Sequence, residues 1–432
     1  MTLDDTIAAL SSGQLPAGIA VLRLSGPAVR AALEELAGGV PEARRAALRL
    51  FRDAAGEPID RGLLLFFPGP ASVTGEDLAE FHLHGGRAVV AAMLKALTAR
   101  PGVRLAEAGE FTRRAFGNGR IDLTEAEGLA DLLSAETEAQ RARAFRQSAG
   151  EFRELAEGWM RRLLRARALI EAEFDFSDEG DVGESAARGV RAEVEALRAD
   201  IERRLGGARR GEIGREGFRV AIAGAPNAGK SSLLNALSAR EVAIVSPEAG
   251  TTRDLVEARL DLQGHAVILT DTAGLRETDG LVERIGIERA RAAVREADLV
   301  LSLAEPNAAF ETLETAAPVW RLRTKADLAA TTGEDTLSVA SGRGLDALLQ
   351  RIAVAAREAA GDPAEVVPTR ERHRLVLAET AAILGTYDPG RQPPEVAAET
   401  LRAAADRLGA LTGRTGVEDI LGVIFSEFCI GK

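Results

Sequence analysis

One short run of residues restricts the fold of this chain more than any other feature. Residues 224–231 read G-A-P-N-A-G-K-S, which fits the pattern G-x-x-x-x-G-K-[ST]. An apolar, strand-like segment (218–223) precedes the run, and the helix-like segment S-L-L-N-A-L-S-A follows it. In this strand–loop–helix context the pattern forms a loop that binds nucleotide phosphates. The sequence therefore predicts a parallel sheet with helices packed on it.

Each residue type in the loop has a physical role. Gly224 and Gly229 let the backbone curl so that successive N–H groups and the helix N-terminus face the phosphates. The Lys230 side chain can reach the terminal phosphates, and the Ser231 hydroxyl can ligate Mg²⁺. We therefore expect nucleotide binding by a continuous run of residues: Asn227, Ala228, Gly229, Lys230, Ser231 and Ser232.

Two downstream runs are expected to complete the phosphate and magnesium site. G-T-T-R-D contains Thr251 and Thr252, and the Thr252 side chain should complete the Mg²⁺ shell. D-T-A-G follows an apolar strand, so that Asp271 should lie near the Mg²⁺ and the Gly274 amide should sense the γ-phosphate. Lys230 and Thr252 are accordingly predicted to take part in catalysis.

A third run is expected to recognise the base. In R-L-R-T-K-A-D, Asp327 should accept hydrogen bonds from the guanine edge while the stem of Lys325 covers the base. Ser338 and Val339, in S-V-A, would supply a backbone N–H to the guanine carbonyl. The usual pattern is N-K-x-D, and Thr324 replaces its asparagine, so nucleotide affinity should fall by about 1 kcal/mol. The order and spacing of these runs predict a protein that binds and hydrolyses GTP.

The residue that orients water in many GTPases is missing from its usual place. Leu275 follows D-x-x-G directly, where a glutamine commonly orients the attacking water. Glu277 and Glu283 are the acidic candidates in the segment that follows. Arg253 and Arg276 are the candidates for an arginine that neutralises transition-state charge. Water activation is therefore predicted to come from another residue.

The rest of the chain indicates several domains. At 432 residues the chain is too long for a single core. The first part alternates short apolar runs with Gly/Pro/Ser punctuation, whereas alanine- and charge-rich helical sequence lies before and after the nucleotide module. We expect the two helical segments to pack together, with the module inserted between them. The predicted parts are 1–118 (mixed α/β), 119–212 (helical), 213–362 (nucleotide module) and 363–432 (helical).

Composition limits the cellular location of the protein and the kinds of partner that it can bind. The chain is 46% hydrophobic and 28% charged, and it has no long apolar stretch that could cross a bilayer. The sequence starts without the features of a signal peptide, and its single cysteine, Cys429, cannot form an internal disulfide, so we expect a cytoplasmic protein. The net charge of -12 argues against a broad electrostatic grip on nucleic acid, although a local basic surface is compatible with it.

Six further runs, spread over the chain, point to a family. They are S-V-T-G-E-D (72–77), L-H-G-G (83–86), A-G-E-F-T-R-R-A-F (108–116), I-D-L-T-E-A-E (121–127), R-I-G-I-E-R-A (284–290) and F-C-I-G-K (428–432). With them the chain resembles the MnmE (TrmE) family of tRNA-modification GTPases over essentially its whole length. The resemblance implies a homodimer with an α/β domain similar to tetrahydrofolate-binding proteins, a discontinuous helical domain and an inserted Ras-like P-loop GTPase domain.

The resemblance also implies a reaction. Members of the family act with an FAD-dependent flavoprotein, MnmG (GidA), in a heterotetramer or larger complex. Together they add a carboxymethylaminomethyl group at C5 of the wobble uridine of certain tRNAs. The one-carbon unit would come from 5,10-methylene- or 5-formyl-tetrahydrofolate, and the sequence leaves open whether glycine or ammonium supplies the amine.

Potassium has a specific role in this family, because it stimulates GTP hydrolysis as two G domains dimerise across the nucleotide. By the resemblance, the ion would be ligated by Asn227, Ser246, Glu248 and Thr251, and Ser246 would also contact GTP. A potassium ion beside the phosphates would stabilise transition-state charge as an arginine finger does. Glu283 would orient the attacking water.

The resemblance further implies a folate site formed by Arg23, Glu80, Arg120 and Lys432. Arg23 and Arg120 could pair with the carboxylates of the cofactor, and Glu80 could bind its pterin edge. The family usually has lysine where this chain has Arg120. Judged by position alone, each charge would more often belong to a surface or interface ion pair. Cys429 has two open interpretations, a small buried hydrophobe or a nucleophile.

Two other functions fit parts of the sequence. A ribosome-assembly GTPase shares the P-N-A/V-G-K-S loop, but such proteins usually carry a basic RNA-binding domain, whereas this chain is acidic and contains F-C-I-G-K. A nucleotide-binding scaffold with little turnover would fit Thr324 and the altered S-V-A run. Turnover measured with and without potassium would separate the scaffold from a potassium-stimulated GTPase.

Overall fold

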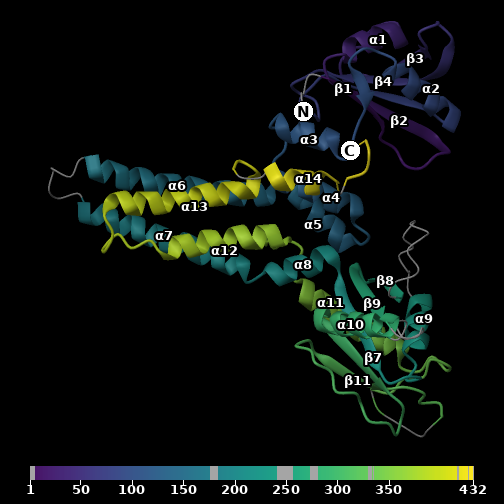
Figure 1. Ribbon diagram of the computed structural model, residues 1–432, viewed down its shortest axis with the longest axis vertical. Helices are drawn as coiled ribbons and strands as arrows, with labels where there is room; N and C mark the ends of the chain where they lie inside the picture. The colour runs from purple at the N-terminus through teal and green to yellow at the C-terminus, as the bar shows by residue number, and fades with distance from the viewer. Residues whose placement is uncertain are drawn as a thin grey trace. The chain divides into compact units, whose positions relative to one another are not determined.

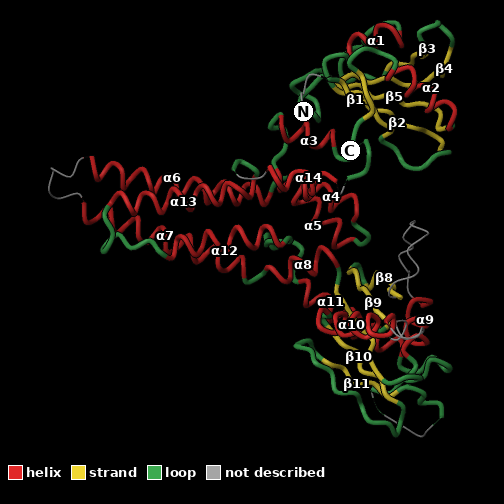
Figure 2. Tube along the Cα trace, in the orientation of Figure 1, coloured by secondary structure: helices red, strands yellow, loops and turns green. Residues whose placement is uncertain are grey.

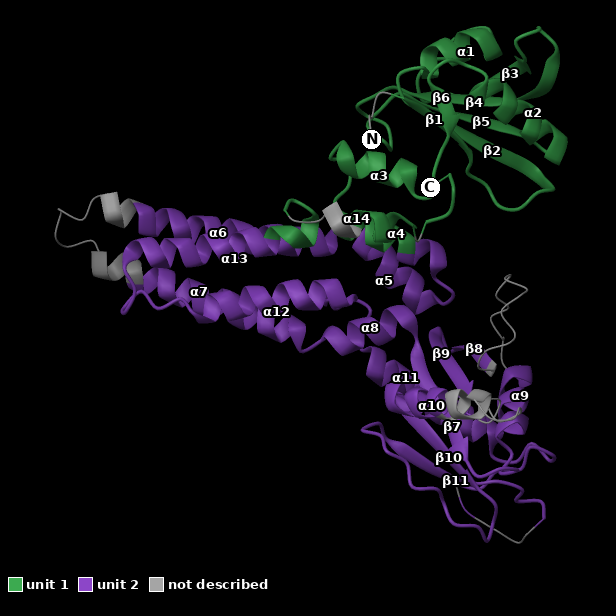
Figure 3. Cartoon of the chain, viewed as in Figure 1, with its two compact units in different colours: residues 1–130, 409–432 green, residues 131–408 purple. Residues whose placement is uncertain are grey.

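The structure is a computed structural model that describes residues 5–175, 183–240, 256–272, 281–328, 333, 335–415, 418–426 and 428–431. The side chains of residues 172–175, 183–187, 256, 281–287 and 418–420 are outside this description. The chain divides into two compact units (Figure 3). Unit 1 comprises Met1–Ala130 and Gly409–Lys432, and unit 2 comprises Asp131–Leu408.

Unit 1 is built on a six-stranded sheet in the order β3-β4-β5-β2-β1-β6, in which only the β1–β6 pair is parallel. The strands are β1 (Thr6–Leu10), β2 (Ala17–Ser25), β3 (Ala47–Arg52), β4 (Pro58–Phe67), β5 (Leu78–Gly85) and β6 (Val103–Leu105). Helices α1 (Val29–Ala37) and α2 (Arg87–Thr98) pack on one face (Figure 1). The core between helices and strands includes Leu22, Leu33 and Phe81.

The other face of this sheet presents apolar side chains to its surroundings. The strand register aligns Leu48, Leu63, His82 and Val21 in one row across β3, β4, β5 and β2. Successive side chains of a strand point to opposite faces, so this row lies opposite the face that bears Leu22 and Phe81. Leu48 and Leu63 are exposed.

Two segments far apart in the sequence meet in unit 1. Helix α3 (Glu110–Gly117), most of α4 (Leu123–Ser134) and α14 (Glu418–Ser426) belong to this unit and lie outside the sheet. Phe425 of α14 packs against Phe116 and Phe428, and Ile430 forms a β-bridge with Ala108. Gly109 has a φ of 66°, and a Cβ there would lie 2.2 Å from the Phe425 carbonyl oxygen, so this approach requires glycine. The runs A-G-E-F and F-C-I-G-K are therefore in contact.

Unit 2 combines a helical part with a second sheet (Figure 2). The helices of the helical part are α5 (Glu138–Ser148), α6 (Glu151–Asp175), α7 (Gly183–Leu205), α8 (Ala208–Glu216), α12 (Glu371–Gly385) and most of α13 (Pro394–Thr412). Helices α6 and α12, which lie before and after the nucleotide module in sequence, both pack against α7. The buried Trp159 of α6 donates its indole N–H to Asp200 of α7 at 2.7 Å.

The sheet of unit 2 has the order β11-β10-β7-β9-β8, with β8 antiparallel to β9 and the other pairs parallel. Its strands are β7 (Phe218–Gly224), β8 (Val256–Leu262), β9 (His265–Asp271), β10 (Leu299–Ala304) and β11 (Val319–Arg323). Helices α9 (Lys230–Arg240) and α11 (Leu345–Ala360) bury Leu233, Leu237 and Ile352 on one face. Helix α10 (Leu281–Glu296) packs through Val294 on the other. Among the described residues, no helix is long and apolar enough to span a membrane.

Candidate functional site

The loop between β7 and α9 has the curled backbone that the sequence predicts. Gly224 has a φ of 144°, and a Cβ there would lie 2.3 Å from the Leu303 carbonyl oxygen. Gly229 has a φ of 91°, and Asn227 adopts the left-handed conformation with a φ of 63°. Asn227 is exposed, whereas Ala228 is buried. Such a loop directs its N–H groups toward one side, where a phosphate group can bind.

Lys230 begins helix α9 and is held across this loop. Its ammonium donates to the carbonyl oxygens of Gly224 at 2.6 Å and Ala225 at 2.9 Å, and the side chain is buried. A cavity of about 580 Å³ adjoins the loop, lined by Gly224, Lys230 and Thr272, by residues of α10 and by residues 311–314, which include two glutamates. The positive charge is therefore fixed beside a space large enough for phosphate groups.

Ser231 and Asp271, which the sequence places at the magnesium ion, come together from the ends of two different elements. The Ser231 hydroxyl, at the start of α9, donates to Oδ2 of Asp271, at the end of β9, at 2.5 Å. Asp271 is buried, and the next residue, Thr272, donates its hydroxyl to the Ile222 carbonyl of β7 at 2.8 Å. A serine hydroxyl and an aspartate carboxylate at this position are hard oxygen ligands of the kind that Mg²⁺ prefers.

Thr324 links the base-recognition segment to the phosphate-binding loop. Its buried hydroxyl donates to the Ala228 carbonyl at 2.8 Å and lies 3.4 Å from the Ala304 carbonyl. The sequence predicts only what is lost when threonine replaces asparagine. The structure adds that this hydroxyl forms a hydrogen bond within the protein. The bond links the base-recognition segment to the phosphate-binding loop.

The other base-recognition residues lie close to Thr324. Ser338 donates its hydroxyl to Oδ1 of Asp327 at 2.5 Å, and this hydrogen bond holds the pKa of Asp327 below its usual value. The backbone N–H of Ser338 donates to the Arg343 carbonyl at 3.1 Å, so Val339 is the better placed of the predicted pair to donate to a base. Lys325 has a φ of 54° and pairs with Glu305 at 2.5 Å.

Replacing Thr324 by valine, which keeps the shape without the hydroxyl, is expected to weaken GDP binding about tenfold. The Ala228 carbonyl would lose its buried donor, which costs about 1–3 kcal/mol. Thr324→Ser should retain most of the affinity, and Thr324→Asn should tighten GDP and GTP binding by restoring the amide. Titration with a fluorescent GDP analogue measures all three variants. A valine variant that binds GDP as tightly as the wild type would show that the tether is dispensable.

Several predicted residues lie outside the described part of the chain. They are Ser246, Glu248, Thr251, Thr252, Arg253, Gly274, Arg276, Glu277 and Lys432. Glu283 belongs to helix α10, but its side chain is not described. Ser232 is exposed in the first turn of α9. The roles that the sequence gives to these residues stay predictions.

The predicted folate residues divide into two groups in unit 1. Arg23 and Glu80 are cross-strand neighbours on β2 and β5, and the Arg23 guanidinium pairs with the Glu80 carboxylate at 2.8 Å. His82 lies next to them, with its Nε2 atom 3.5 Å from Glu80. Arg120 is exposed, and its side chain lies beside Gly75 of the S-V-T-G-E-D run. Arg23 and Glu80 thus pair with each other, and their predicted role in binding folate stays a prediction.

A polar network in unit 1 was not predicted from the sequence. The buried guanidinium of Arg114 contacts Asp5 at 2.5 Å, Glu76 at 3.2 Å and Glu110 at 3.2 Å. Arg104 pairs with the same Asp5 and Glu110, at 2.6 and 2.5 Å. The spacing of Glu110 and Arg114 on one helical face is the only local signal for this network. The network gives a structural role to Glu110 and Arg114 of A-G-E-F-T-R-R-A-F and to Glu76 of S-V-T-G-E-D.

Cys429 is exposed, so the interpretation as a buried hydrophobe is wrong; the neighbouring Phe428 occupies the buried position. The Ser11 hydroxyl donates to the Gly431 carbonyl at 2.8 Å, which fixes the F-C-I-G-K run beside β1. The structure thus places Cys429 at the surface of unit 1, and a nucleophilic role for its thiol stays a prediction.

The glycine-rich loop, the fixed Lys230 and the Ser231–Asp271 pair define unit 2 as the nucleotide-binding part of a P-loop protein of the GTPase class.

Known proteins agree with this assignment. Residues 123–429 match the model of the MnmE helical domain, and residues 6–120 match that of the GTP-binding protein TrmE N-terminus. The tRNA modification GTPase MnmE of Brucella anthropi is 54% identical over 437 residues, covering 100% of this chain and 99% of that protein.

The MnmE protein of Brucella canis is 53% identical over 436 residues, covering 99% of this chain and 98% of that protein. The solved G domain of the T. maritima FeoB iron transporter matches 32% of this chain and 99% of its own, at 24% identity and a TM-score of 0.24, which is too low to support a conclusion. The chain belongs to the MnmE family of tRNA modification GTPases. The predicted fold class, GTP binding and GTPase activity in tRNA modification are thereby confirmed.

Proposed function

We propose that this chain is a potassium-stimulated GTPase that modifies tRNA together with an FAD-dependent MnmG-type flavoprotein. The pair adds a carboxymethylaminomethyl group at C5 of the wobble uridine of certain tRNAs, using a tetrahydrofolate one-carbon unit. The observation that carries the proposal is the Lys230–Ser231–Asp271 constellation in a chain of the MnmE family. The proposed parts are residues 1–118, 119–212, 213–362 and 363–432, in a cytoplasmic protein.

Hydrolysis requires charge neutralisation around the transferred phosphoryl group. Lys230 would bind the terminal phosphates, while Ser231 and Thr252 would hold a Mg²⁺ that neutralises phosphate charge, with Asp271 beside it. Water attacks the γ-phosphorus, the bond to the β–γ bridging oxygen breaks, and GDP and phosphate are released. Glu283 would orient the water in place of the missing glutamine.

Potassium would supply the charge that an arginine finger supplies in other GTPases. Asn227 supports this role because its side chain is exposed at the tip of the loop, on a backbone held at a φ of 63°. Carbonyl and carboxylate oxygens of Ser246, Glu248 and Thr251 would complete the site. Dimerisation of two G domains would close this site over the nucleotide.

The folate proposal rests on the charged residues of unit 1. Arg120 is exposed beside the S-V-T-G-E-D loop, and Lys432 follows a segment that is fixed beside β1. The Arg23–Glu80 pair lies on the sheet face that bears the exposed Leu48 and Leu63. We assign this apolar face to the proposed homodimer, because large apolar side chains on an open sheet face are typical of a subunit contact.

Analysis of wobble-uridine nucleosides tests the proposed function. We expect that a strain without its own copy of the gene lacks the C5 carboxymethylaminomethyl group and regains it when this chain is expressed with its flavoprotein partner. The Lys230→Ala variant, whose GTP hydrolysis should be about 10²–10³-fold slower, is the matched control and should not restore the group. Retention of the modified uridine in the deletion strain would contradict the assignment.

A further inference from the structure

Helix α5 contacts the nucleotide module at a place remote in sequence from its phosphate-binding loop. The Ala139 backbone N–H, in the first turn of α5, donates to the Gly264 carbonyl at 3.1 Å, in the turn between β8 and β9. Glu136, just before the helix, pairs with Arg259 of β8 at 3.2 Å. The start of α5 is itself fixed by a capping box formed by Thr137 and Gln140.

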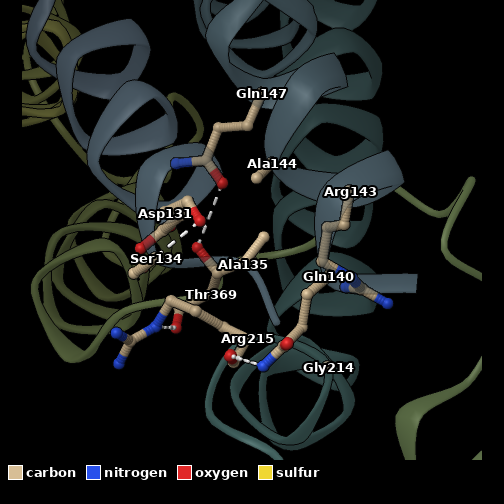
Figure 4. A pocket seen from close by; sticks show the side chains of 10 residues that line it. All are labelled: Asp131, Ser134, Ala135, Gln140, Arg143, Ala144, Gln147, Gly214, Arg215 and Thr369. Carbon is tan, nitrogen blue, oxygen red and sulfur yellow. Dashed lines mark hydrogen bonds between the residues drawn. The ribbon is translucent and has the colours of Figure 1, made fainter. Parts of the chain in front are cut away.

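The same helix also holds the two points at which the chain enters and leaves the module. Gln140 donates its amide to the Arg215 carbonyl at 2.9 Å, where α8 leads into β7 (Figure 4). Arg143 donates to the Ala360 carbonyl at 3.1 Å, at the last residue of α11. A Cβ on Gly214 of α8 would lie only 2.8 Å from the Arg143 guanidinium carbon, so helix and guanidinium are packed closely.

Polar side chains lie where α5, α8 and the segment after α11 meet. A cavity of about 60 Å³ lies among them, bordered by Gln140, Arg143, Gln147 and Thr369 (Figure 4). Thr369 donates its hydroxyl to Gln147 at 3.3 Å. Arg143 is 8% exposed, and within the described part of the chain its buried Nη1 atom has no hydrogen-bond partner. A buried guanidinium that is only partly hydrogen-bonded costs stability, which suggests that it serves another purpose.

The strand pair that α5 touches connects the turn to the nucleotide site. Strand β9 begins at His265, next to Gly264, and ends at Asp271, which contacts Ser231. Strand β8 begins at Val256, two residues after the end of the run G-T-T-R-D that contains Thr252. The two strands pair along their whole length, from Val256–Asp271 to Leu262–His265, so a displacement at the nucleotide end would also move the turn.

We propose that α5 is a fixed joint that transmits the nucleotide state to the helical part, and that Arg143 is its positioning residue. Arg143 holds the end of α11 against α5. Movement of the β8–β9 turn therefore displaces the helical part as a whole, and the two connections between the module and the helices do not bend. The proposal rests on the proposed function, because it concerns how GTP hydrolysis is coupled to tRNA modification.

The first test separates coupling from hydrolysis in the full chain with its flavoprotein partner. Arg143→Met keeps the length of the side chain but removes its donors. We expect GTP turnover to stay within about threefold of the wild type while uridine modification falls about tenfold, within the range typical of allosteric coupling. Arg141→Ala is the matched control, because Arg141 lies on the same helix and pairs with Glu138 at the surface. It should change neither rate.

Two results would overturn the proposal. One is modification by Arg143→Met at the wild-type rate; the other is an equal loss of turnover and modification, which indicates general destabilisation. Thermal unfolding of both variants identifies the second case directly. A wild-type chain that modifies no tRNA would contradict the proposed function instead, so the two failures are distinguishable.

The second test locks the joint. The Cβ of Glu138 lies 3.9 Å from an ideal Cβ at Gly264, within the range of disulfides. The double variant Glu138→Cys/Gly264→Cys, with Cys429 retained and the link verified by peptide mapping, can be compared in its oxidised and reduced forms. Both forms share any strain at Gly264, whose φ is 87°. We expect equal turnover and modification, because a fixed joint does not open. Loss of modification on oxidation would show that the joint must open.

Discussion

Replacing Lys230 by alanine is expected to reduce GTP hydrolysis about 10²–10³-fold, the loss seen when one preorganised transition-state donor is removed. The ammonium of Lys230 is buried and is positioned by two loop carbonyls, which fixes its charge at the phosphate-binding loop. Single-turnover hydrolysis at saturating GTP measures the effect. Lys95→Ala, at an exposed position of α2 in unit 1, is the control and should hydrolyse GTP normally.

Comparing hydrolysis rates in KCl and NaCl distinguishes the role of Lys230 from that of Asn227. Lys230→Ala should be slow in both KCl and NaCl at equal ionic strength, because the lysine acts on the phosphates directly. Asn227→Ala should lose only the additional rate that potassium provides. A Lys230→Ala variant within tenfold of the wild-type rate would contradict the assignment of this lysine, and potassium-independent turnover of the wild type would contradict the potassium site.

Replacing Arg114 by alanine is expected to destabilise unit 1 by about 3–5 kcal/mol, because it breaks a buried charge network: Glu76 loses this guanidinium, and Arg104 alone remains beside Glu110 and Asp5. Arg114 is 2% exposed and contacts Asp5, Glu76 and Glu110. Hydrogen exchange of peptides from β1 and α3 measures the loss, since both tryptophans, Trp159 and Trp320, lie in unit 2. The control is Arg113→Ala.

Arg113 is the neighbour of Arg114 in sequence, but it is partly exposed and makes longer contacts, at 3.4 Å to Glu107 and 3.7 Å to Glu110. Its loss should cost less than about 1 kcal/mol, as is usual for exposed pairs. Equal protection of β1 and α3 in the Arg114→Ala variant and the wild type would show that the network does not stabilise unit 1.

The same network makes the stability of unit 1 depend on pH. Burial raises the pKa of Glu110 and Asp5, but hydrogen bonds and charges from Arg104 and Arg114 outweigh burial, so both pKa values lie below their ordinary 4.5 and 3.8. A carboxyl with a depressed folded-state pKa stabilises the fold fully above its unfolded-state value. This stabilisation is present at neutral pH and is lost as the pH falls below about 4. Arg114→Ala should reduce this acid dependence.

The sequence by itself determined those parts of the nucleotide site whose residues are consecutive along the chain. The loop at 224–231 is recognisable because the groups that bind phosphate follow one another along the chain, between a strand and a helix that each have a clear pattern. Asp271 was found because it ends a predicted strand, and in a parallel sheet the ends of such strands meet at one edge.

Only the tertiary structure decided how the polar side chains pair. Arg23 contacts Glu80, the Thr324 hydroxyl contacts the Ala228 carbonyl, and Arg114 contacts Asp5. The sequence shows that these residues are polar, and it shows their neighbours along the chain. Their partners, however, are set by the register of sheets and by the packing of segments that are dozens of residues apart or more. A local pattern contains no information on which distant backbone or carboxylate comes within hydrogen-bonding distance.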